Sequence, residues 1–334
     1  MLGKNRVNVL IMGIDARKTE LNSRSDTMIL ASIDKQSRRA VLIWIPRDTR
    51  IEVKPGVSAK INSVNLLKGP EAACRTVGEL LNCEVKYYVI VNFTGFARII
   101  DALGGVKIDV ETDMYHYDPD PALSINLSQG EQVLSGQEAL GYVRYRGGPT
   151  ADIGRTARQQ KFIKALAEQM FSGGNILKLP GLVPELMENV RTNIPLREAM
   201  RMAKMAKSFD PANIVTQTLP GYSFTDPKTG ASYWEADREI AKGIIDDLFN
   251  GKTYEVAKDP PNWKGGGSNR YTPVSHPAEN YSSLNQDLNG EQRKDLFVPE
   301  GESSGDNLPV DNNMQAGAGE QASDVFKPDA DLQP

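Results

Sequence analysis

The stretch Val7-Asn8-Val9-Leu10-Ile11-Met12-Gly13-Ile14-Asp15-Ala16-Arg17 decides the fold of this 334-residue chain. Its apolar run, residues 7–12, ends in a glycine, which is typical of a buried strand that carries the following loop to the edge of a sheet. Asp15 and Arg17 lie on that loop. The sequence therefore predicts charged side chains at a sheet edge, directly after a core strand.

Strands and helices alternate outward from this first strand. Residues 27–33 and 40–45 predict a strand hairpin, and Pro46 ends its second strand so that Arg47 and Asp48 lie at the tip. Ser135, with Glu138 in capping-box position, opens a short helix. Further strands are predicted over 87–91, 106–110 and 214–219, and further helices over 71–81, 93–103, 176–190, 195–208 and 236–249. The alternation predicts a layered α/β domain.

Composition narrows the class of protein. An apolar content of 40% is enough to bury a core, and the formal charge of -4 with a pI near 5.5 speaks against a general nucleic-acid binder.

No run approaches the roughly 18 to 20 apolar residues that cross a bilayer, and residues 1–6 lack the apolar region of a signal peptide. After Lys252, proline, glycine, asparagine, serine and acids dominate, so we expect a domain over residues 1–252 and a disordered tail over 253–334.

Cys74 and Cys83 leave their oxidation state open. An unbroken helix would separate the two residues by about 13 Å, too far for a disulfide. Asn82 could end the helix before Cys83 and so permit a bridge, and buried free thiols are the alternative. Neither cysteine has the partners or the spacing of a zinc site.

Classical nucleophilic catalysis finds little support in the sequence. The chain has two histidines, His116 in a polar loop and His276 in the expected tail, which speaks against a Ser-His-Asp triad. A glycine-rich phosphate loop with Lys and Ser or Thr is absent from the sequence. Any transfer is therefore expected to depend on charged side chains and a metal.

Acids and arginines occur in three separated segments that together suit a metal-bound pyrophosphate. Asp15 and Asp26 are the candidate metal ligands, since Mg²⁺ takes one or two carboxylates and fills its shell with phosphate oxygens and water. Guanidinium groups bind phosphate bidentately and stay charged. The candidate phosphate ligands are Arg24, Arg47, Arg144 and Arg146, and these six residues are also the candidate catalytic residues. Turn-capping aspartates and solvated surface arginines are the alternatives.

A second group of polar residues opens the helix expected after residue 151. Asp152 could cap that helix or orient Arg155 through an ion pair. Arg155 and Arg158 are three residues apart, on one side of its first turns. Together with Gln160 they form a second set of candidate substrate phosphate ligands.

Methionines are frequent in the helices that follow these arginines. Methionine fills irregular apolar space, which would suit a polyprenyl chain between helices and sheet. Ordinary core packing is the alternative. The residues concerned are Met170, Met187, Met200, Met202 and Met205.

These motifs occur together and in an order that resembles the LytR-CpsA-Psr family over roughly residues 7–249. The motifs that carry the resemblance are the opening stretch, Arg24-Ser25-Asp26-Thr27-Met28, Ile45-Pro46-Arg47-Asp48-Thr49, Lys60-Ile61-Asn62, Gly95-Phe96, Asp101-Ala102-Leu103-Gly104-Gly105-Val106, Tyr142-Val143-Arg144-Tyr145-Arg146, Asp152-Ile153-Gly154-Arg155 and Arg158-Gln159-Gln160. The family pattern often has glycine where this chain has Ala151, which puts only the local turn in doubt.

The resemblance implies a fold and a set of roles. The fold is a layered α-β-α domain with a central mixed sheet flanked by helices. Asp15 and Asp26 match the family's metal-binding aspartates, for Mg²⁺ with Mn²⁺ as a second candidate. The four arginines named above match its phosphate-binding arginines.

By the same resemblance, the activity is phosphotransfer in cell-wall biogenesis. A glycopolymer moves from a polyprenyl-pyrophosphate carrier to the C6 hydroxyl of a peptidoglycan sugar, and polyprenyl phosphate leaves. The family usually has an N-terminal membrane helix and an extracellular catalytic domain, so we expect a membrane anchor before this sequence, with a soluble member as the alternative. The polymer could be teichoic acid, capsule or another wall polymer.

Two other functions remain open. The same site could act as a pyrophosphatase, with water in place of the sugar hydroxyl. A non-enzymatic envelope regulator or lipid-binding module is a different class of function. Mg²⁺-dependent phosphate release from a polyprenyl pyrophosphate would separate the enzymes from the binding module.

Overall fold

The computed structural model describes residues 6–15, 23–120, 123–147, 151–171 and 177–257, all within the unit Met1–Ala278. Its centre is a mixed sheet with the strand order β11-β6-β1-β2-β3-β12. The strands are β1 (Arg6–Ile14), β2 (Ser25–Asp34), β3 (Arg39–Trp44), β6 (Tyr87–Asn92), β11 (Arg191–Thr192) and β12 (Ile214–Thr218). β1 is parallel to β6 and β3 is parallel to β12, whereas β2 is antiparallel to both of its neighbours. The carboxyl ends of β1, β3, β6 and β12 therefore meet the start of β2 at one edge.

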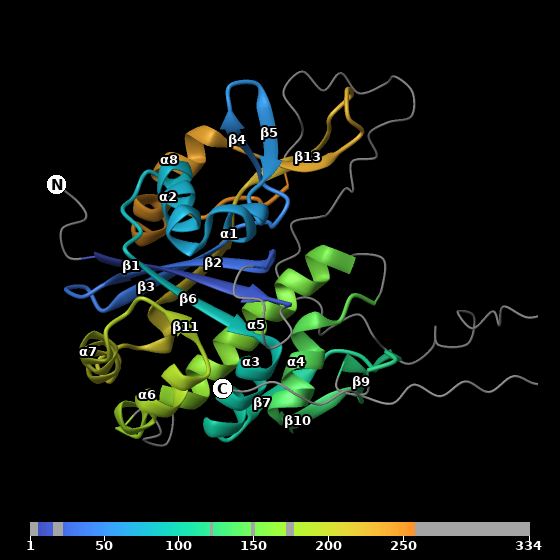
Figure 1. The fold of residues 1–334 in the computed structure, drawn as a ribbon. Coiled ribbons are helices and arrows are strands. Elements are labelled where there is room, and N and C mark those ends of the chain that lie inside the picture. The colour runs from blue at the N-terminus through green and yellow to red at the C-terminus, as the bar shows by residue number, and fades with distance from the viewer. Residues whose placement is uncertain (1–5, 16–22, 121–122, 148–150, 172–176, 258–334) are drawn as a thin grey trace, which may run out of the picture. The chain divides into compact units, whose positions relative to one another are not determined.

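One face of the sheet is fully buried. Successive side chains of a strand point to opposite faces, and Leu10, Leu30 and Ile43, on three neighbouring strands, share the face toward the larger core cluster and are 0% exposed. Helices α1 (Ser63–Lys68), α2 (Pro70–Leu81) and α8 (Arg238–Phe249) cover this face (Figure 1). Helix α2 ends at Leu81 because Asn82 adopts the left-handed conformation with φ 50°.

The second layer lies on the other side of the sheet and has its own core (Figure 1). Its helices are α3 (Phe93–Ala102), α4 (Gly136–Arg144), α5 (Ala151–Phe171), α6 (Leu179–Glu188) and α7 (Leu196–Ala206), and its strands are β7 (Val106–Val110), β8 (Met114–His116), β9 (Ile125–Leu127) and β10 (Gly130–Leu134). The predicted capping box of Ser135 and Glu138 is present at the start of α4. Gly104 and Gly105, with φ 86° and 80°, end α3 in the left-handed conformation.

Two small hairpins that the sequence did not predict stand on the α2 and α8 side. They are β4 (Arg50–Lys54) with β5 (Val57–Lys60), and β13 (Gly221–Thr225) with β14 (Ser232–Ala236). The guanidinium of Arg50 lies over the Phe224 ring at 5.1 Å and so joins the two hairpins. A single 3-10 turn, Pro211–Asn213, precedes β12.

The expected layered α/β domain with a central mixed sheet is confirmed, and three of its details differ. The helix expected over 176–190 spans Leu179–Glu188. Helix α5 begins at Ala151, so Asp152 lies inside the first turn instead of ahead of the helix. Backbone contacts also continue past the boundary expected at Lys252: Gly221 N–H donates to Val256 O at 3.0 Å, and Gly221 forms a β-bridge with Ala257.

Residues 258–334, most of the expected tail, lie outside the described residues, as does His276. Cys74 and Cys83 are free thiols, Cys74 buried and Cys83 half-buried. Of the two alternatives left open by the sequence, the structure thus has the free thiols. Within the described ranges, no helix combines the length and the apolar character needed to span a membrane.

Candidate active site

The predicted charged residues gather at the sheet edge where β1, β3 and β6 end and β2 begins. Asp15 follows β1 directly and is exposed, and Asp26 is the second residue of β2. Because Ile14 pairs with Ser25, these two carboxylates come from adjacent positions on neighbouring strands. Arg17, in the same expected loop, lies outside the described residues.

A β-bulge sets the position of Asp26. Gly13 pairs with Thr27 and Ile14 with Ser25, which leaves Asp26 as the extra residue of β2. Bulges of this kind redirect a side chain locally. A Cβ atom at position 13 would approach Thr27 Cβ to 3.3 Å, so a glycine there eases the close packing of the two strands at the bulge.

Arg47 joins the end of β3 to Asp26. Its Nη1 donates to Asp26 Oδ1 at 2.7 Å, and its Nε lies 3.8 Å from Asp48 Oδ2. Lys60 Nζ lies 2.7 Å from the other oxygen of Asp48. The side chains of Asp26 and Arg47 are 37% and 27% exposed, so a ligand from solution can reach both.

The segment around Asn62 and Asn65 holds the loop before β2 in place. Asn65 Nδ2 donates to Ser23 O at 2.8 Å, and Ser25 N–H donates to Asn62 O at 3.3 Å. Asn62 N–H in turn donates to Arg47 O at 3.2 Å. Arg24, whose side chain is exposed, therefore lies between two anchored residues beside the carboxylates.

Arg144 brings the end of α4 to the same edge. Its guanidinium lies 4.6 Å from the centre of the Phe93 ring, and Phe93 directly follows β6, the parallel neighbour of β1. Its Nη1 also donates to Leu123 O at 3.3 Å. Arg146 lies two residues further along the chain and is exposed.

Arg158 supports this segment from α5. It donates to Tyr145 O, and its guanidinium lies over the Tyr145 ring at 5.3 Å. Burial lowers the pKa of Arg158, although the nearby carboxylate of Glu111 opposes this effect. Arg158 therefore contacts the backbone between Arg144 and Arg146, which indicates a positioning role beside the phosphate role expected for it.

Gln159 is a site residue that the sequence analysis passed over. Its Oε1 accepts from Trp44 Nε1, and its Nε2 donates to Thr27 Oγ1 and Val143 O, each at 3.3 Å. One side chain thus ties β2, β3 and α4 together at the site. Gln160, the candidate phosphate ligand, instead donates to Thr218 Oγ1 at 2.9 Å, at the end of β12. The i, i+4 spacing of Arg155 and Gln159 was the available signal.

Asp15 and Asp26 suit a cation that takes few protein ligands. Mg²⁺ typically binds one or two carboxylates and completes its octahedron with phosphate oxygens and water. In the part of the chain that the structure describes, no group of three or more His, Cys, Asp or Glu side chains is placed to hold a metal. The two aspartates therefore suit a cation shared with a phosphate ligand better than a closed metal site.

The sheet face toward α5, α6 and α7 carries apolar side chains that are only half-buried and belong to neither core cluster. These residues are Val7, Ile11, Ile33, Leu42, Val89 and Val91. The five methionines named above, on α5, α6 and α7, are half-buried as well. Other apolar side chains of this face are buried, namely Val9, Ile29, Ala31 and Trp44, so only part of the face is incompletely packed.

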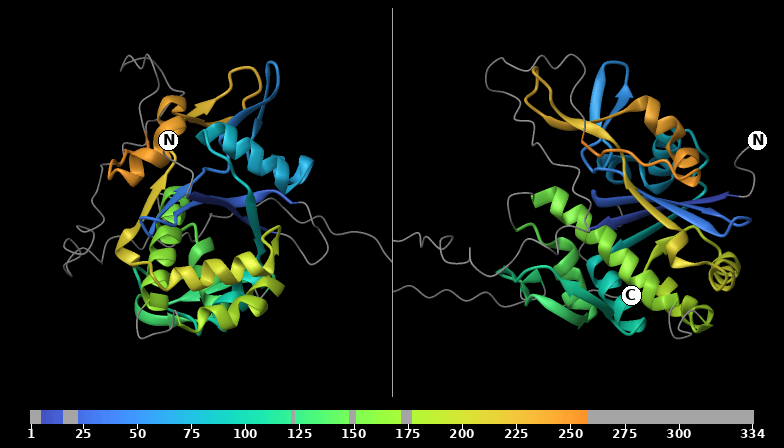
Figure 2. Two further views of the ribbon diagram at one scale, coloured as in Figure 1. Left: turned by 90° about the vertical axis from the view of Figure 1, so that its left-hand side faces the viewer. Right: turned by 180° about the vertical axis from the view of Figure 1, so that it is seen from behind.

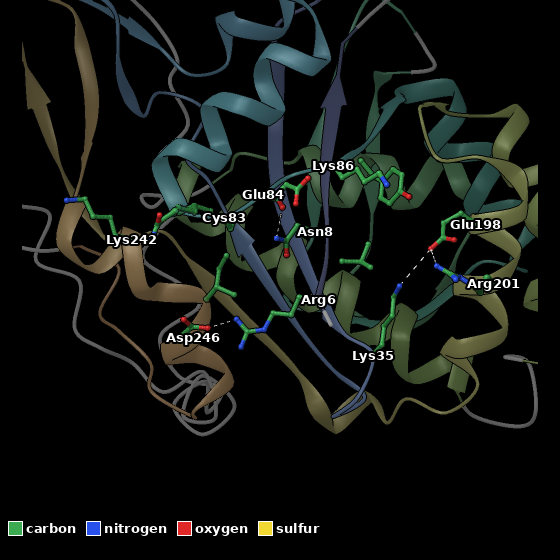
Figure 3. A pocket seen from close by; sticks show the side chains of 15 residues that line it. Arg6, Asn8, Lys35, Cys83, Glu84, Lys86, Glu198, Arg201, Lys242 and Asp246 are labelled. Carbon is green, nitrogen blue, oxygen red and sulfur yellow. Dashed lines mark hydrogen bonds and ion pairs between the residues drawn. The ribbon is translucent and has the colours of Figure 1, made fainter. Parts of the chain in front are cut away.

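The opposite edge of the sheet holds a cavity of about 460 Å³ (Figure 3). Its side chains pair with one another: Arg6 with Asp246, and Glu198 with both Lys35 and Arg201. Arg6 lines this cavity and lies at the start of β1, whereas Asp15 follows the end of β1, so the length of the strand separates the two places. None of the candidate site residues lines the cavity.

Comparison with known proteins identifies relatives over most of the described region. The LytR_cpsA_psr family model matches residues 2–250. The polyisoprenyl-teichoic acid--peptidoglycan teichoic acid transferase TagV of Bacillus subtilis (strain 168) is 32% identical over 240 residues, which cover 70% of this chain and 61% of TagV. The regulatory protein MsrR of Staphylococcus aureus (strain COL) is 33% identical over 250 residues, covering 73% of this chain and 75% of MsrR.

Solved structures agree with this fold. The crystal structure of B. subtilis TagV has a TM-score of 0.64 and 29% identity, and the match covers 75% of this chain and 99% of that one. TagT bound to LI-WTA has a TM-score of 0.58 and 26% identity, with 74% of this chain and 91% of that one covered. The chain therefore shares its layered α/β architecture with these proteins.

Proposed function

Because the chain belongs to the LytR-CpsA-Psr family, we propose that it transfers a glycopolymer from a polyprenyl-pyrophosphate carrier to the C6 hydroxyl of a peptidoglycan sugar. Polyprenyl phosphate is the leaving group. The observation that carries the proposal is the meeting of Asp15, Asp26 and Arg47 with Arg144 at one sheet edge. The similarity to TagV, a teichoic acid transferase, supports this substrate class.

The reaction exchanges one phosphorus–oxygen bond for another. The sugar hydroxyl oxygen attacks the phosphorus that carries the glycopolymer, and the bond from that phosphorus to the lipid phosphate oxygen breaks. The hydroxyl proton passes to a carboxylate, Asp15 or Asp26, or to the departing phosphate. The product is a phosphodiester between glycopolymer and peptidoglycan.

Arginines supply the electrostatic part of this chemistry. Negative charge is spread over the phosphoryl oxygens and the leaving group in a loose transition state. Fixed guanidinium groups stabilise that charge without having to reorganise. Arg144 is already held by the Phe93 ring, and Arg24 and Arg146 are exposed at the same edge.

A divalent cation completes the proposed site. Asp15 and Asp26 would hold Mg²⁺, with Mn²⁺ as the second candidate, and the cation would neutralise pyrophosphate oxygens when bound. Arg47 now donates to Asp26, so on substrate binding its guanidinium would turn from the carboxylate to a phosphate. Arg155 and Gln160 remain candidates for a second set of phosphate contacts.

The lipid part of the carrier suits the half-buried sheet face. Apolar side chains such as Ile11, Leu42 and Val91 would lose their remaining exposure against a prenyl chain. The methionines of α7 can adjust to its shape. With a lipid carrier and peptidoglycan as substrates, we place the protein at the outer face of the cell membrane.

A specific observation keeps hydrolysis as a second activity. Asp15 is exposed and Asp26 is 37% exposed, so water reaches the site edge. Water could replace the sugar hydroxyl, which would make the protein a polyprenyl-pyrophosphate pyrophosphatase. The site residues would be the same, and only the acceptor would differ.

Release of polyprenyl phosphate from a lipid-pyrophosphate-linked sugar tests the proposal. We expect Mg²⁺-dependent release by the full chain, a faster rate with peptidoglycan fragments, and loss of both with Asp26→Asn. Glu79→Gln, which removes a carboxylate from an exposed position of α2, is the matched control and should behave as wild type. Wild-type release by Asp26→Asn would contradict the metal assignment, and no release by the unaltered chain would favour the regulator or lipid-binding module.

A further inference from the structure

The hairpin of β8 and β9 has one buried face and one exposed aromatic face. Its buried side chains, Met114, Ile125 and Leu127, belong to the second core cluster. Tyr115, on the other face, is 60% exposed, and Tyr117, just beyond the end of β8, is 85% exposed. Asn126, also exposed, pairs with Tyr115 across the two strands. We call Tyr115, Tyr117 and Asn126 the tyrosine face.

The two rings of the tyrosine face are available to a ligand. Tyr115 and Tyr117 make no hydrogen bond or ring contact with the residues that the structure describes. Tyr115 lies in β8 opposite Asn126, and Tyr117 directly follows His116, the last residue of β8. The two exposed rings are therefore two residues apart at this end of the hairpin, and an amide lies opposite the first ring.

This hairpin is fixed to the candidate active site. Leu123, just before β9, accepts a hydrogen bond from Arg144 Nη1 at 3.3 Å. Ser124 Oγ accepts from Asp118 N–H at 3.0 Å and donates to Asp118 O at 3.1 Å, which holds the ends of the two strands together. The hairpin lies on the side of the molecule to which β1 delivers Asp15 (Figures 1 and 2). A chain-like ligand on the tyrosine face could therefore extend to the arginines.

The charge of the segment that contains the hairpin limits the class of ligand that the tyrosine face can bind. The sequence has no lysine or arginine between Lys107 and Arg144, whereas it has several acids there, including Asp113 and Asp118. Such a surface repels anionic lipid headgroups and phosphate-rich polymers. Exposed aromatic rings with a neighbouring amide instead suit a neutral ligand that has apolar C–H faces and hydrogen-bonding groups.

We propose that the tyrosine face binds the acceptor glycan, a strand of N-acetylated sugars, next to the pyrophosphate site. The sugar rings stack on Tyr115 and Tyr117, and the Asn126 amide bonds to an acetamido group or a hydroxyl. The assignment of this glycan as the acceptor rests on the proposed function. Because the donor polymer of a teichoic-acid carrier is rich in phosphate, the acidic hairpin favours the acceptor over the donor.

The test is binding of a soluble β-1,4-linked N-acetylglucosamine hexamer to the full chain, measured by calorimetry. We expect Tyr115→Ala with Tyr117→Ala to weaken binding tenfold or more. Tyr115→Phe with Tyr117→Phe keeps both rings and should stay within about twofold of wild type. Leu67→Ala, at a 69% exposed position of α1, is the control for removing an exposed apolar side chain.

Each result decides between the proposals. Hexamer affinity that is unchanged in the double alanine variant, or undetectable in wild type, overturns the tyrosine face. Binding to phosphatidylglycerol vesicles that the double alanine variant loses would instead assign the face to the membrane and overturn it too. If wild type binds the hexamer through the tyrosines yet releases no polyprenyl phosphate, the tyrosine face stands and the proposed transferase function fails.

Discussion

Asp26 is itself the extra residue of the β-bulge in β2. In a regular strand, the alternation of side chains would determine to which face of the sheet the Asp26 side chain points. Because Asp26 lies in the bulge opposite Gly13 and Ile14, its carboxylate can instead accept a hydrogen bond from Arg47. The sequence indicated the two residues but not the bulge, because pairing between distant strands determines it.

Arg47 offers a direct test of bidentate phosphate binding. Arg47→Lys keeps the charge but loses the planar fork, and we expect a loss of about 1.5 to 3 kcal/mol in transition-state binding. The measurement is kcat/KM for release of polyprenyl phosphate. Lys204→Arg, at an exposed position of α7, is the control substitution and should leave the rate unchanged. Equal rates for Lys and Arg at position 47 would show that charge alone is used.

Gln159 is expected to position the site. Gln159→Ala removes three hydrogen bonds and leaves Nε1 of the buried Trp44 without its acceptor, so the free energy of unfolding should fall by about 1 to 3 kcal/mol. Urea denaturation measures the change. Gln160→Ala, which removes one bond to Thr218, should cost less. A larger loss for Gln160 than for Gln159 would contradict this assignment.

The sequence could not decide between these two glutamines. The predicted helix and the spacing of Arg155 and Arg158 were sound, but the rotation of α5 about its axis follows from the packing of Phe162 against Phe96 and Tyr142. Such contacts join segments far apart in the chain. The sequence therefore predicts which helix serves the site, but the tertiary packing selects the side chain.

Among the elements, the ones with strong local signals were predicted well. The capping box at Ser135 is in place, and α2 ends before Cys83 at Asn82, as one of the two alternatives allowed. The hairpins β4–β5 and β13–β14 were missed because their short strands depend on mutual contacts such as that of Arg50 with Phe224. Local sequence carries little of that information.

Helix α4 deserves a stability test because it ends in Arg144. Ser135→Ala removes the side chain that accepts from Glu138 N–H, and loss of such a cap costs about 1 kcal/mol. Thermal unfolding should show a lower Tm, whereas Ser135→Asp should restore most of it. A Tm unchanged by the alanine would mean that tertiary packing alone holds the start of α4.

Taken as a whole, the domain packs tightly on one side of its sheet and leaves part of the apolar face on the other side half-buried. If the half-buried face holds the lipid, affinity should rise with prenyl length by about 0.8 kcal/mol per buried CH₂, up to a limit. Geranyl, farnesyl and longer pyrophosphates, compared at constant Mg²⁺, provide the series. A flat response would assign that face to ordinary core.

The two thiols at the tightly packed side of the sheet, Cys74 and Cys83, should make the stability of the domain depend on pH. Burial raises the pKa of Cys74 and of Cys83 from 9.0 to about 11, so the folded state keeps both protons longer than the unfolded state. The free energy of unfolding should therefore fall as the pH rises from about 9 to about 11. Urea denaturation across this range measures it, and Cys74→Ala with Cys83→Ala should flatten the curve. A fall of the same size in that variant would assign the effect to other groups.

The strand order has a consequence for the newly made chain. β1 is synthesised first, yet it lies inside the sheet between β2 and β6, and β12, which closes the far side, comes more than a hundred residues later. Proteins emerge from the ribosome N-terminus first, and pairings between distant strands form slowly. The early strands therefore have one edge open until β12 is available, and an open edge can pair with another chain. Since Gln160 reaches Thr218 only when β12 has arrived, the nascent protein cannot complete its site before nearly the whole domain has been translated.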